Sequence, residues 1–214
     1  MLIHPWDEAA PDEWGALLAV VDFGQLITSG LVDGYPVVVP SHFVHVGDQI
    51  WLHLARPNPA WRALEADPRA VFAISVDYAY IEAAWNADED VPPEHGVPTS
   101  YYTSVQFRGT VTVVDDDEGK LEILRRQLSR LEPAGSHRAP PSLDLESDRR
   151  QLPGIRGIRL DIDSVLAKMK YGGNRSLPKR REIAGRLAER DGPGDAAARQ
   201  HLLRRTAAGS MVDG

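Results

Sequence analysis

The hydrophobic pattern of the chain changes its period near residue 22. Before that point Trp14, Leu17, Leu18 and Val21 recur three or four residues apart, which predicts a helix that begins near Pro11. After it, apolar residues alternate with polar ones or form short runs bounded by glycine and proline, as strands do. We therefore expect a mainly β chain with peripheral helices.

The strand-like segments follow one another closely. They lie at residues 25–29, 35–40, 43–46, 49–54, 70–76, 78–83, 103–114 and 155–163. Gly47 and Asp48 between two of them predict a tight hairpin, and a short helix fits Pro59–Ala66 because the proline after Asp67 ends it. Since no internal repeat is present, six or seven short strands favour a small antiparallel barrel that the last segment completes.

The C-terminal third has a different character. Residues 132–152 are rich in Pro, Ser, Arg and Asp and are predicted to form a mobile linker. Two helices are predicted at the end, from Pro178 to about Arg190 and from Asp195 to about Arg205. We therefore expect one domain over residues 1–170 and a C-terminal helical extension over 171–214.

Composition narrows the possible chemistry. The 214 residues include no cysteine, which excludes disulfides, thiolate metal sites and cysteine nucleophiles, so redox chemistry would need a cofactor. No apolar run approaches the ~18–20 residues that span a bilayer. The first residues also lack the basic flank and apolar stretch of a signal peptide, so we expect a cytoplasmic protein without a membrane segment.

Charge is distributed unevenly along the chain. Residues 1–165 hold 13 Lys and Arg against 26 Asp and Glu, whereas residues 166–205 hold 11 against 4. An acidic body repels nucleic-acid phosphate, so DNA binding would depend on the basic segment alone. That segment contains Lys168, Lys170, Arg175, Lys179, Arg180 and Arg181. A solvated helix face is the favoured interpretation of it.

The turn after the second hairpin, Arg56-Pro57-Asn58-Pro59, combines features of an anion site. Asparagine is a preferred N-cap and proline suits the first helical position. A helix N-terminus attracts phosphate, and the planar guanidinium of Arg56 can bind phosphate oxygens in pairs. The alternative is that Asn58 only caps the helix and Arg56 is solvated.

Several blocks of sequence resemble one known family. Tyr35–Phe43 and Trp51–Trp61 are similar to the FMN-binding split barrels related to pyridoxamine-phosphate oxidase, and most closely to their PaiB branch. The other matching blocks, in the same order, are Ala79-Tyr80-Ile81, Val97-Pro98-Thr99 with Tyr102, and Lys168–Tyr171 with Asn174-Arg175. The resemblance implies a six- to seven-stranded antiparallel split barrel with peripheral helices and a C-terminal helical pair.

The same resemblance implies a homodimer that binds FMN at the subunit interface and acts on an unidentified small molecule. By position, His53, Arg56, Asn58 and Trp61 are expected at the phosphate and ribityl chain. Tyr80, Thr99, Tyr102 and Thr103 are expected near the ring or the facing subunit, and Asn174 and Arg175 belong to the late motif of the branch.

Three functions stay open at this point. The protein is expected to be a flavin-dependent redox protein or an FMN-binding negative transcriptional regulator. The alternative is a haem-binding or haem-degrading split barrel with His45, His53 or His95 as axial ligand. No metal site is predicted, because the acidic residues around His95 are read as a solvated loop.

Overall fold

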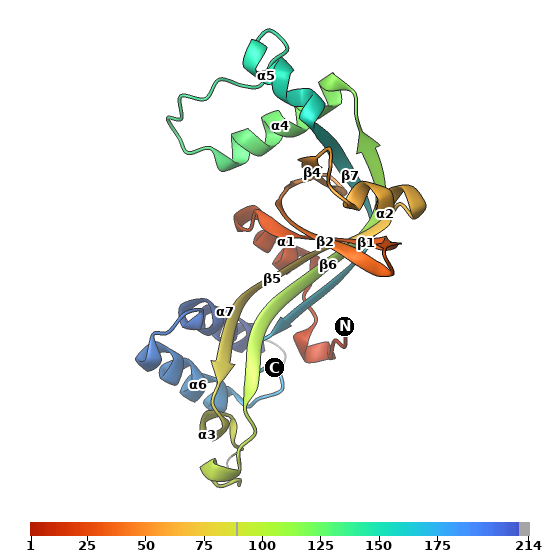
Figure 1. The fold of residues 1–214 in the computed structure, drawn as a ribbon. Coiled ribbons are helices and arrows are strands. Elements are labelled where there is room, and N and C mark those ends of the chain that lie inside the picture. The colour runs from red at the N-terminus through yellow and green to blue at the C-terminus, as the bar shows by residue number, and fades with distance from the viewer. Residues whose placement is uncertain (89, 210–214) are drawn as a thin grey trace. The chain divides into compact units, whose positions relative to one another are not determined.

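The computed structural model describes residues 1–88 and 90–209 (Figure 1). Its strands are β1 Phe23–Val32, β2 Tyr35–His42, β3 Val44–Val46, β4 Gln49–Ala55, β5 Arg69–Ile81, β6 Thr99–Val114 and β7 Ile155–Lys170. Its α-helices are α1 Pro11–Val20, α2 Ala60–Ala66, α3 Ala83–Asn86, α4 Asp117–Leu131, α5 Glu146–Gln151, α6 Leu177–Arg190 and α7 Asp195–Gly209, and short 3-10 turns lie at Pro5–Asp7, Pro93–His95 and Leu152–Gly154.

The seven strands form one antiparallel sheet in the order β2-β1-β5-β6-β7-β4-β3. Strands β2 and β3 are its two edges, so the sheet does not close on itself, as expected for a split barrel. The mixed β and α architecture that the sequence predicts is confirmed. No helix in residues 1–88 and 90–209 has the length and apolarity needed to cross a membrane.

The chain divides into two compact units. Unit 1 comprises residues 1–14, 75–105 and 167–214, and unit 2 comprises residues 15–74 and 106–166. Strands β5, β6 and β7 contribute residues to both. The C-terminal helices therefore belong to unit 1, together with residues 1–14 and 75–105.

Unit 2 contains the two predicted hairpins. Strand β1 pairs with β2 and β5, and β4 pairs with β3 and β7. Val44, Trp51, Val114 and Ile123 form a buried cluster between this sheet and α4. Helix α2 packs directly on β1 (Figure 1): a Cβ on Gly30 would lie 1.9 Å from the carbonyl oxygen of Ala63.

Unit 1 is built around aromatic rings and the helices α6 and α7, which pack side by side (Figure 1). Tyr171 is fully buried and stacks on His201 with 4.5 Å between ring centroids. Nε2 of His201 lies 2.9 Å from Oδ2 of Asp77. The helices thus bury apolar faces against the ends of β5 and β7.

Four of the predicted strand segments, which correspond to β5, β6 and β7, are wrong in their limits. Residues 70–76 and 78–83 are one strand, β5, which runs through Asp77 although that residue has φ of 57°. Aspartate tolerates this left-handed conformation better than most residues, so the strand is distorted but does not end. Strand β6 begins at Thr99 instead of Thr103, and β7 continues past Asp163 to Lys170.

The C-terminal helices are confirmed to within a few residues. The predicted linker over residues 132–152 contains helix α5. Arg138 forms an ion pair of 2.5 Å with the buried Asp148, whose carboxylate also accepts a hydrogen bond from the backbone N–H of Ser142. The mobility of this segment stays a prediction.

Candidate functional site

The predicted anion site begins with Arg56, at the turn between β4 and α2. Its side chain is 44% exposed. The guanidinium donates to both carboxylate oxygens of Asp115, at 2.5 and 3.1 Å, and its Nε donates to the carbonyl of Pro153 at 2.6 Å. The side chain is therefore partly exposed but not free, because both of its terminal nitrogens already donate to the Asp115 carboxylate.

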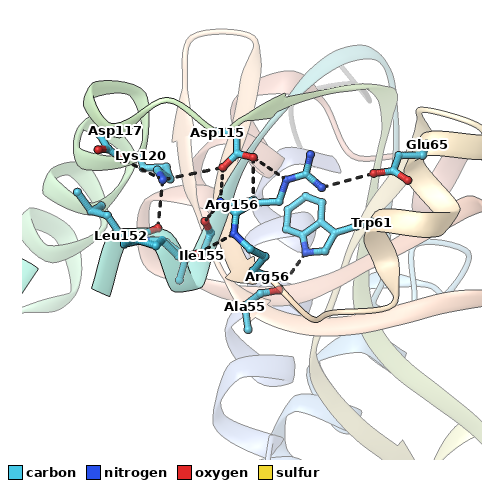
Figure 2. Close-up of polar contacts among 11 residues, drawn as sticks. Ala55, Arg56, Trp61, Glu65, Asp115, Asp117, Lys120, Leu152, Ile155 and Arg156 are labelled. Carbon is cyan, nitrogen blue, oxygen red and sulfur yellow. Dashed lines mark hydrogen bonds and ion pairs between the residues drawn. The ribbon is translucent and has the colours of Figure 1, made fainter. Parts of the chain in front are cut away.

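Asp115 is surrounded by cations (Figure 2). Besides Arg56, Nε of Arg156 lies 3.3 Å and Nζ of Lys120 lies 3.9 Å from its carboxylate oxygens. The hydrogen bonds from Arg56, helped by the charges of Arg156 and Lys120, hold the pKa of Asp115 below its ordinary value. Three basic side chains thus converge on one oxyanion. We call these four residues the Asp115 cluster.

Two members of the Asp115 cluster, Lys120 and Arg156, have further partners (Figure 2). Lys120 is buried, donates to the carbonyl of Leu152 at 3.1 Å and lies 2.9 Å from Asp117. Arg156 lies 3.5 Å from Glu65 and stacks over the ring of Trp61 at 4.9 Å. These contacts fix both side chains around the carboxylate.

One donor of the Asp115 cluster is paired by charge alone. Nε of Arg156 is buried and lies 3.3 Å from the Asp115 carboxylate as an ion pair, but among the described residues it forms no hydrogen bond. Two guanidinium groups and an ammonium group are the donor set that binds phosphate in proteins. The cluster therefore fits the phosphate of FMN in donor chemistry, provided that the phosphate takes the place of the Asp115 carboxylate.

Asn58 and Trp61 shape the turn itself. The side-chain oxygen of Asn58 accepts a hydrogen bond of 2.9 Å from the backbone N–H of Ala60. Pro59 already has helical dihedral angles, so Asn58 acts as the cap, as its place in the sequence predicts. Trp61 is buried and donates to the carbonyl of Ala55 at 2.9 Å, which holds the first turn of α2 against the end of β4.

His53 points away from this cluster of contacts into a cavity of about 360 Å³ within unit 2. There its Nδ1 lies 2.7 Å from Oε1 of Gln127, and its ring lies edge-on to His42 at 5.6 Å. Burial, followed by the charge of His53, lowers the pKa of His42. The other walls are mixed: Leu124, Leu128, Leu131, Leu152 and Ile155 line the cavity together with Glu132, Arg138, Asp148 and Gln151.

The remaining predicted residues belong to unit 1. Thr99, Asn174 and Arg175 line one cavity of about 390 Å³. Thr103 is buried, and its hydroxyl lies 2.8 Å from that of Tyr171. Tyr102 lies under Nζ of Lys168, at 5.8 Å from the ring centroid. Tyr80 is 45% exposed and its carbonyl accepts a hydrogen bond from Arg190.

The structure thus brings together Arg56, Asn58 and Trp61 in unit 2 and Thr99, Asn174 and Arg175 in unit 1. Sequence reasoning missed the partners that matter in each group. Asp115 lies just after β6, and Arg156 lies near the start of β7. The Asp115 carboxylate joins Arg56, 59 positions before it, to Arg156, 41 positions after it, and no local pattern signals this convergence.

The basic segment that was the candidate DNA surface is mostly engaged within unit 1. Lys179 pairs with Glu182 at 2.8 Å, and Arg180 donates to the carbonyls of Gly173 and Arg175. Lys168 is buried, and Lys170 lines the 390 Å³ cavity. Arg181 is an exposed member of the segment.

Comparison with known proteins agrees with this fold. The structure is similar to a FAD- and haem-binding protein from Mycobacterium smegmatis, with a TM-score of 0.59, 21% identity and coverage of 82% of this chain and 78% of that one. It is similar to a flavocytochrome from Azotobacter vinelandii, with a TM-score of 0.58, 18% identity and coverage of 79% and 75%. At these identities the likeness establishes the fold alone.

A conserved hypothetical protein from Mycobacterium tuberculosis is also similar, with a TM-score of 0.55, 16% identity and coverage of 79% of this chain and 90% of that one. No curated protein matches the sequence. The family model described as "Putative FMN-binding domain" matches residues 1–164, which include strands β1 to β6, most of β7 and every member of the Asp115 cluster. The chain therefore belongs to this family of FMN-binding domains.

Proposed function

We propose that this protein is a flavin-dependent redox protein in which Arg56 and Arg156 bind the phosphate of FMN. The observation that carries the proposal is the convergence of three cations on the Asp115 carboxylate, with Nε of Arg156 held there by charge but not by a hydrogen bond. A phosphate offers more oxygens than a carboxylate and more negative charge. It would displace Asp115 from Arg56 and offer Arg156 a hydrogen-bond acceptor.

Bound FMN supplies hydride or electron transfer at its ring, and the protein supplies binding and orientation. Trp61 holds Arg156 in place through the stacking contact, and Asn58 fixes the start of the helix that carries Trp61. Lys120 is anchored by the carbonyl of Leu152, so its charge stays beside the exchangeable carboxylate. The side chains of this chain thus bind and orient the cofactor.

Two substitutions test the proposal because they act in opposite directions. Arg56→Ala removes the bidentate donor and is expected to weaken FMN binding by about tenfold or more, the range for a charged hydrogen bond. Asp115→Asn keeps the shape and removes the competing charge, so FMN should bind more tightly. Quenching of flavin fluorescence measures both affinities.

Arg62→Ala is the matched control, since Arg62 is an exposed arginine on α2, the helix that follows the turn of Arg56. Its FMN affinity should equal that of the unmodified protein. Equal affinities for Arg56→Ala and Arg62→Ala would place the phosphate elsewhere and reject the proposal.

Haem binding is a second candidate, which the cavity at His53 favours. A histidine that lines a cavity with several leucines, beside a second histidine, is an arrangement that can ligate haem iron. Titrating haemin into the purified protein should then give a Soret band that His53→Ala loses and His45→Ala keeps. Yellow flavin bands alone, with no Soret band on haemin addition, would remove this candidate.

A regulatory role through DNA binding would depend on a small number of exposed basic side chains. Because Lys168, Lys179 and Arg180 already have protein partners, the segment presents little free basic surface. If it binds DNA, Arg181→Glu should weaken gel retardation and reduce its salt dependence. Retardation unaffected by Arg181→Glu would exclude this segment as the DNA surface.

A further inference from the structure

Unit 1 contains a cavity that basic and aromatic side chains line together. About 390 Å³ in volume, it lies between the N-terminal residues, the start of β6, and the end of β7 with the turn that follows. Residues from four parts of the chain meet there, although they are up to 173 positions apart. Its polar wall includes Asp7, Thr99, Tyr101, Lys168, Lys170 and Arg175.

Positive charge exceeds negative charge in this wall. Lys168 donates to the carbonyl of Leu2 at 2.9 Å and lies 3.7 Å from Asp7. Arg175 pairs with Asp88, whose carboxylate is mostly exposed. Lys170 donates to Oγ1 of Thr99 at 2.7 Å and, within the part of the chain that the structure describes, forms no ion pair.

The two lysines also disfavour each other's charge. They are two positions apart on β7, so both side chains project from the same face of the strand. Burial, followed by the charge of Lys168, lowers the pKa of Lys170. An anion between them would offset this repulsion.

Tyr101 supplies an independent observation. Its side chain is 1% exposed and lines the cavity, and its hydroxyl has no hydrogen-bond partner among the described residues. An unsatisfied buried hydroxyl destabilises the folded state, so native structures rarely keep one without a use. The glycine at 172 preserves the space beside it, because a Cβ there would lie 2.4 Å from the hydroxyl.

We propose that this cavity is a second anion site, which binds the phosphate group of a small phosphate monoester other than FMN. Lys170, Lys168 and the Tyr101 hydroxyl would donate to the phosphate oxygens. The volume leaves room for an organic part beyond the phosphate. His4 and Trp6, stacked at 4.7 Å with 8° between their ring planes, provide a flat wall for that part.

The assignment separates the two groups of predicted cofactor residues. Thr99 and Arg175 belong to this second ligand, whereas Arg56 and Trp61 belong to FMN. Because the two sites share no residue, an experiment can reject either proposed site without rejecting the other.

Titration calorimetry with inorganic phosphate on FMN-loaded protein tests the site. One phosphate per chain is expected to bind without displacing FMN. Lys170→Met removes a charge at constant length, and Tyr101→Phe removes only the unpartnered hydroxyl, so each should weaken phosphate binding by about tenfold. Lys179→Met is the control outside the cavity and should bind phosphate normally.

The variants remain informative if one of them is unstable. Tyr101→Phe breaks no hydrogen bond present in the structure, so it should fold as the unmodified protein does, which circular dichroism checks. Phosphate binding that is identical in Lys170→Met, Tyr101→Phe and Lys179→Met would overturn the site. Release of FMN by phosphate, or loss of FMN from Lys170→Met, would overturn it as well, because the cavity would then hold the cofactor's own phosphate.

Discussion

Two adjacent tyrosines of β6 differ in burial and in the side of the strand that they face. Tyr101 is fully buried and faces the basic cavity, whereas Tyr102 is half-buried beside Lys168. Alternation along a strand requires that the two rings face opposite sides, which the sequence also indicates. This alternation does not indicate which of the two tyrosines belongs to a binding site. The resemblance implies that Tyr102 lies near the flavin ring or the facing subunit.

The burial of Tyr101 has a measurable consequence. Loss of solvation raises the pKa of its hydroxyl from about 10 to about 12, against the smaller opposing effect of Arg175. Because the folded value is raised, the contribution to stability is complete below pH 10 and is lost as pH rises through about 12. Ultraviolet titration should show one of the six tyrosines ionising last, and Tyr101→Phe should remove that late phase. A late phase that persists in Tyr101→Phe would assign it to another tyrosine.

At the scale of elements, the contact between β1 and α2 positions the proposed phosphate site. The register of β1 against β2 shifts between Ile27 and Leu31, and Gly30 lies in this irregular stretch. Its missing side chain lets the backbone of α2 approach closely. The sequence shows the glycine as part of a loop, and only the packing explains why a side chain is excluded there.

Gly30→Ala should therefore destabilise the protein. The added Cβ would lie 1.9 Å from the carbonyl oxygen of Ala63, so β1 and α2 must separate, at a cost of about 1–3 kcal/mol. Urea unfolding measures this loss.

Gly185→Ala is the control for Gly30→Ala. Gly185 is exposed on α6, a Cβ there meets nothing within 4 Å, and alanine should stabilise the helix by about 0.5–1 kcal/mol. Equal effects of the two substitutions would show that α2 does not pack on β1 as described.

At the scale of the whole molecule, the β1–β2 hairpin presents apolar side chains to solvent. Phe23, Leu31, Tyr35 and Val38 are between 51% and 75% exposed. Several exposed apolar side chains on one hairpin at a sheet edge are typical of an interaction surface. The resemblance implies a homodimer, and this hairpin is the surface that we propose for it.

Sedimentation equilibrium should accordingly give twice the mass of one chain, with one FMN bound per chain. Val38→Lys places a charge in the proposed interface and is expected to shift the equilibrium toward monomer. Val97→Lys, at an apolar position of unit 1 that is 71% exposed, should leave the dimer intact. A dimer that withstands Val38→Lys would place the interface on another surface.

The sequence by itself determined the order and type of most elements, because hydrophobic periodicity, caps and turn residues act over short stretches. It placed the α2 cap at Asn58 and the C-terminal helices to within a few residues. It misjudged strand limits at Asp77 and beyond Asp163, because a strand continues where a neighbour supplies hydrogen bonds, whatever its local pattern.

Only the tertiary structure decided which charges meet. Arg56 was expected at an anion, yet its partner Asp115 comes from just after β6, and the second arginine at that carboxylate, Arg156, comes from the start of β7. Lys170 looked like part of a basic surface and instead lines a cavity with Tyr101. Electrostatic sites depend on distances of a few ångströms between residues far apart in the chain, and those distances exist only after the strands have paired.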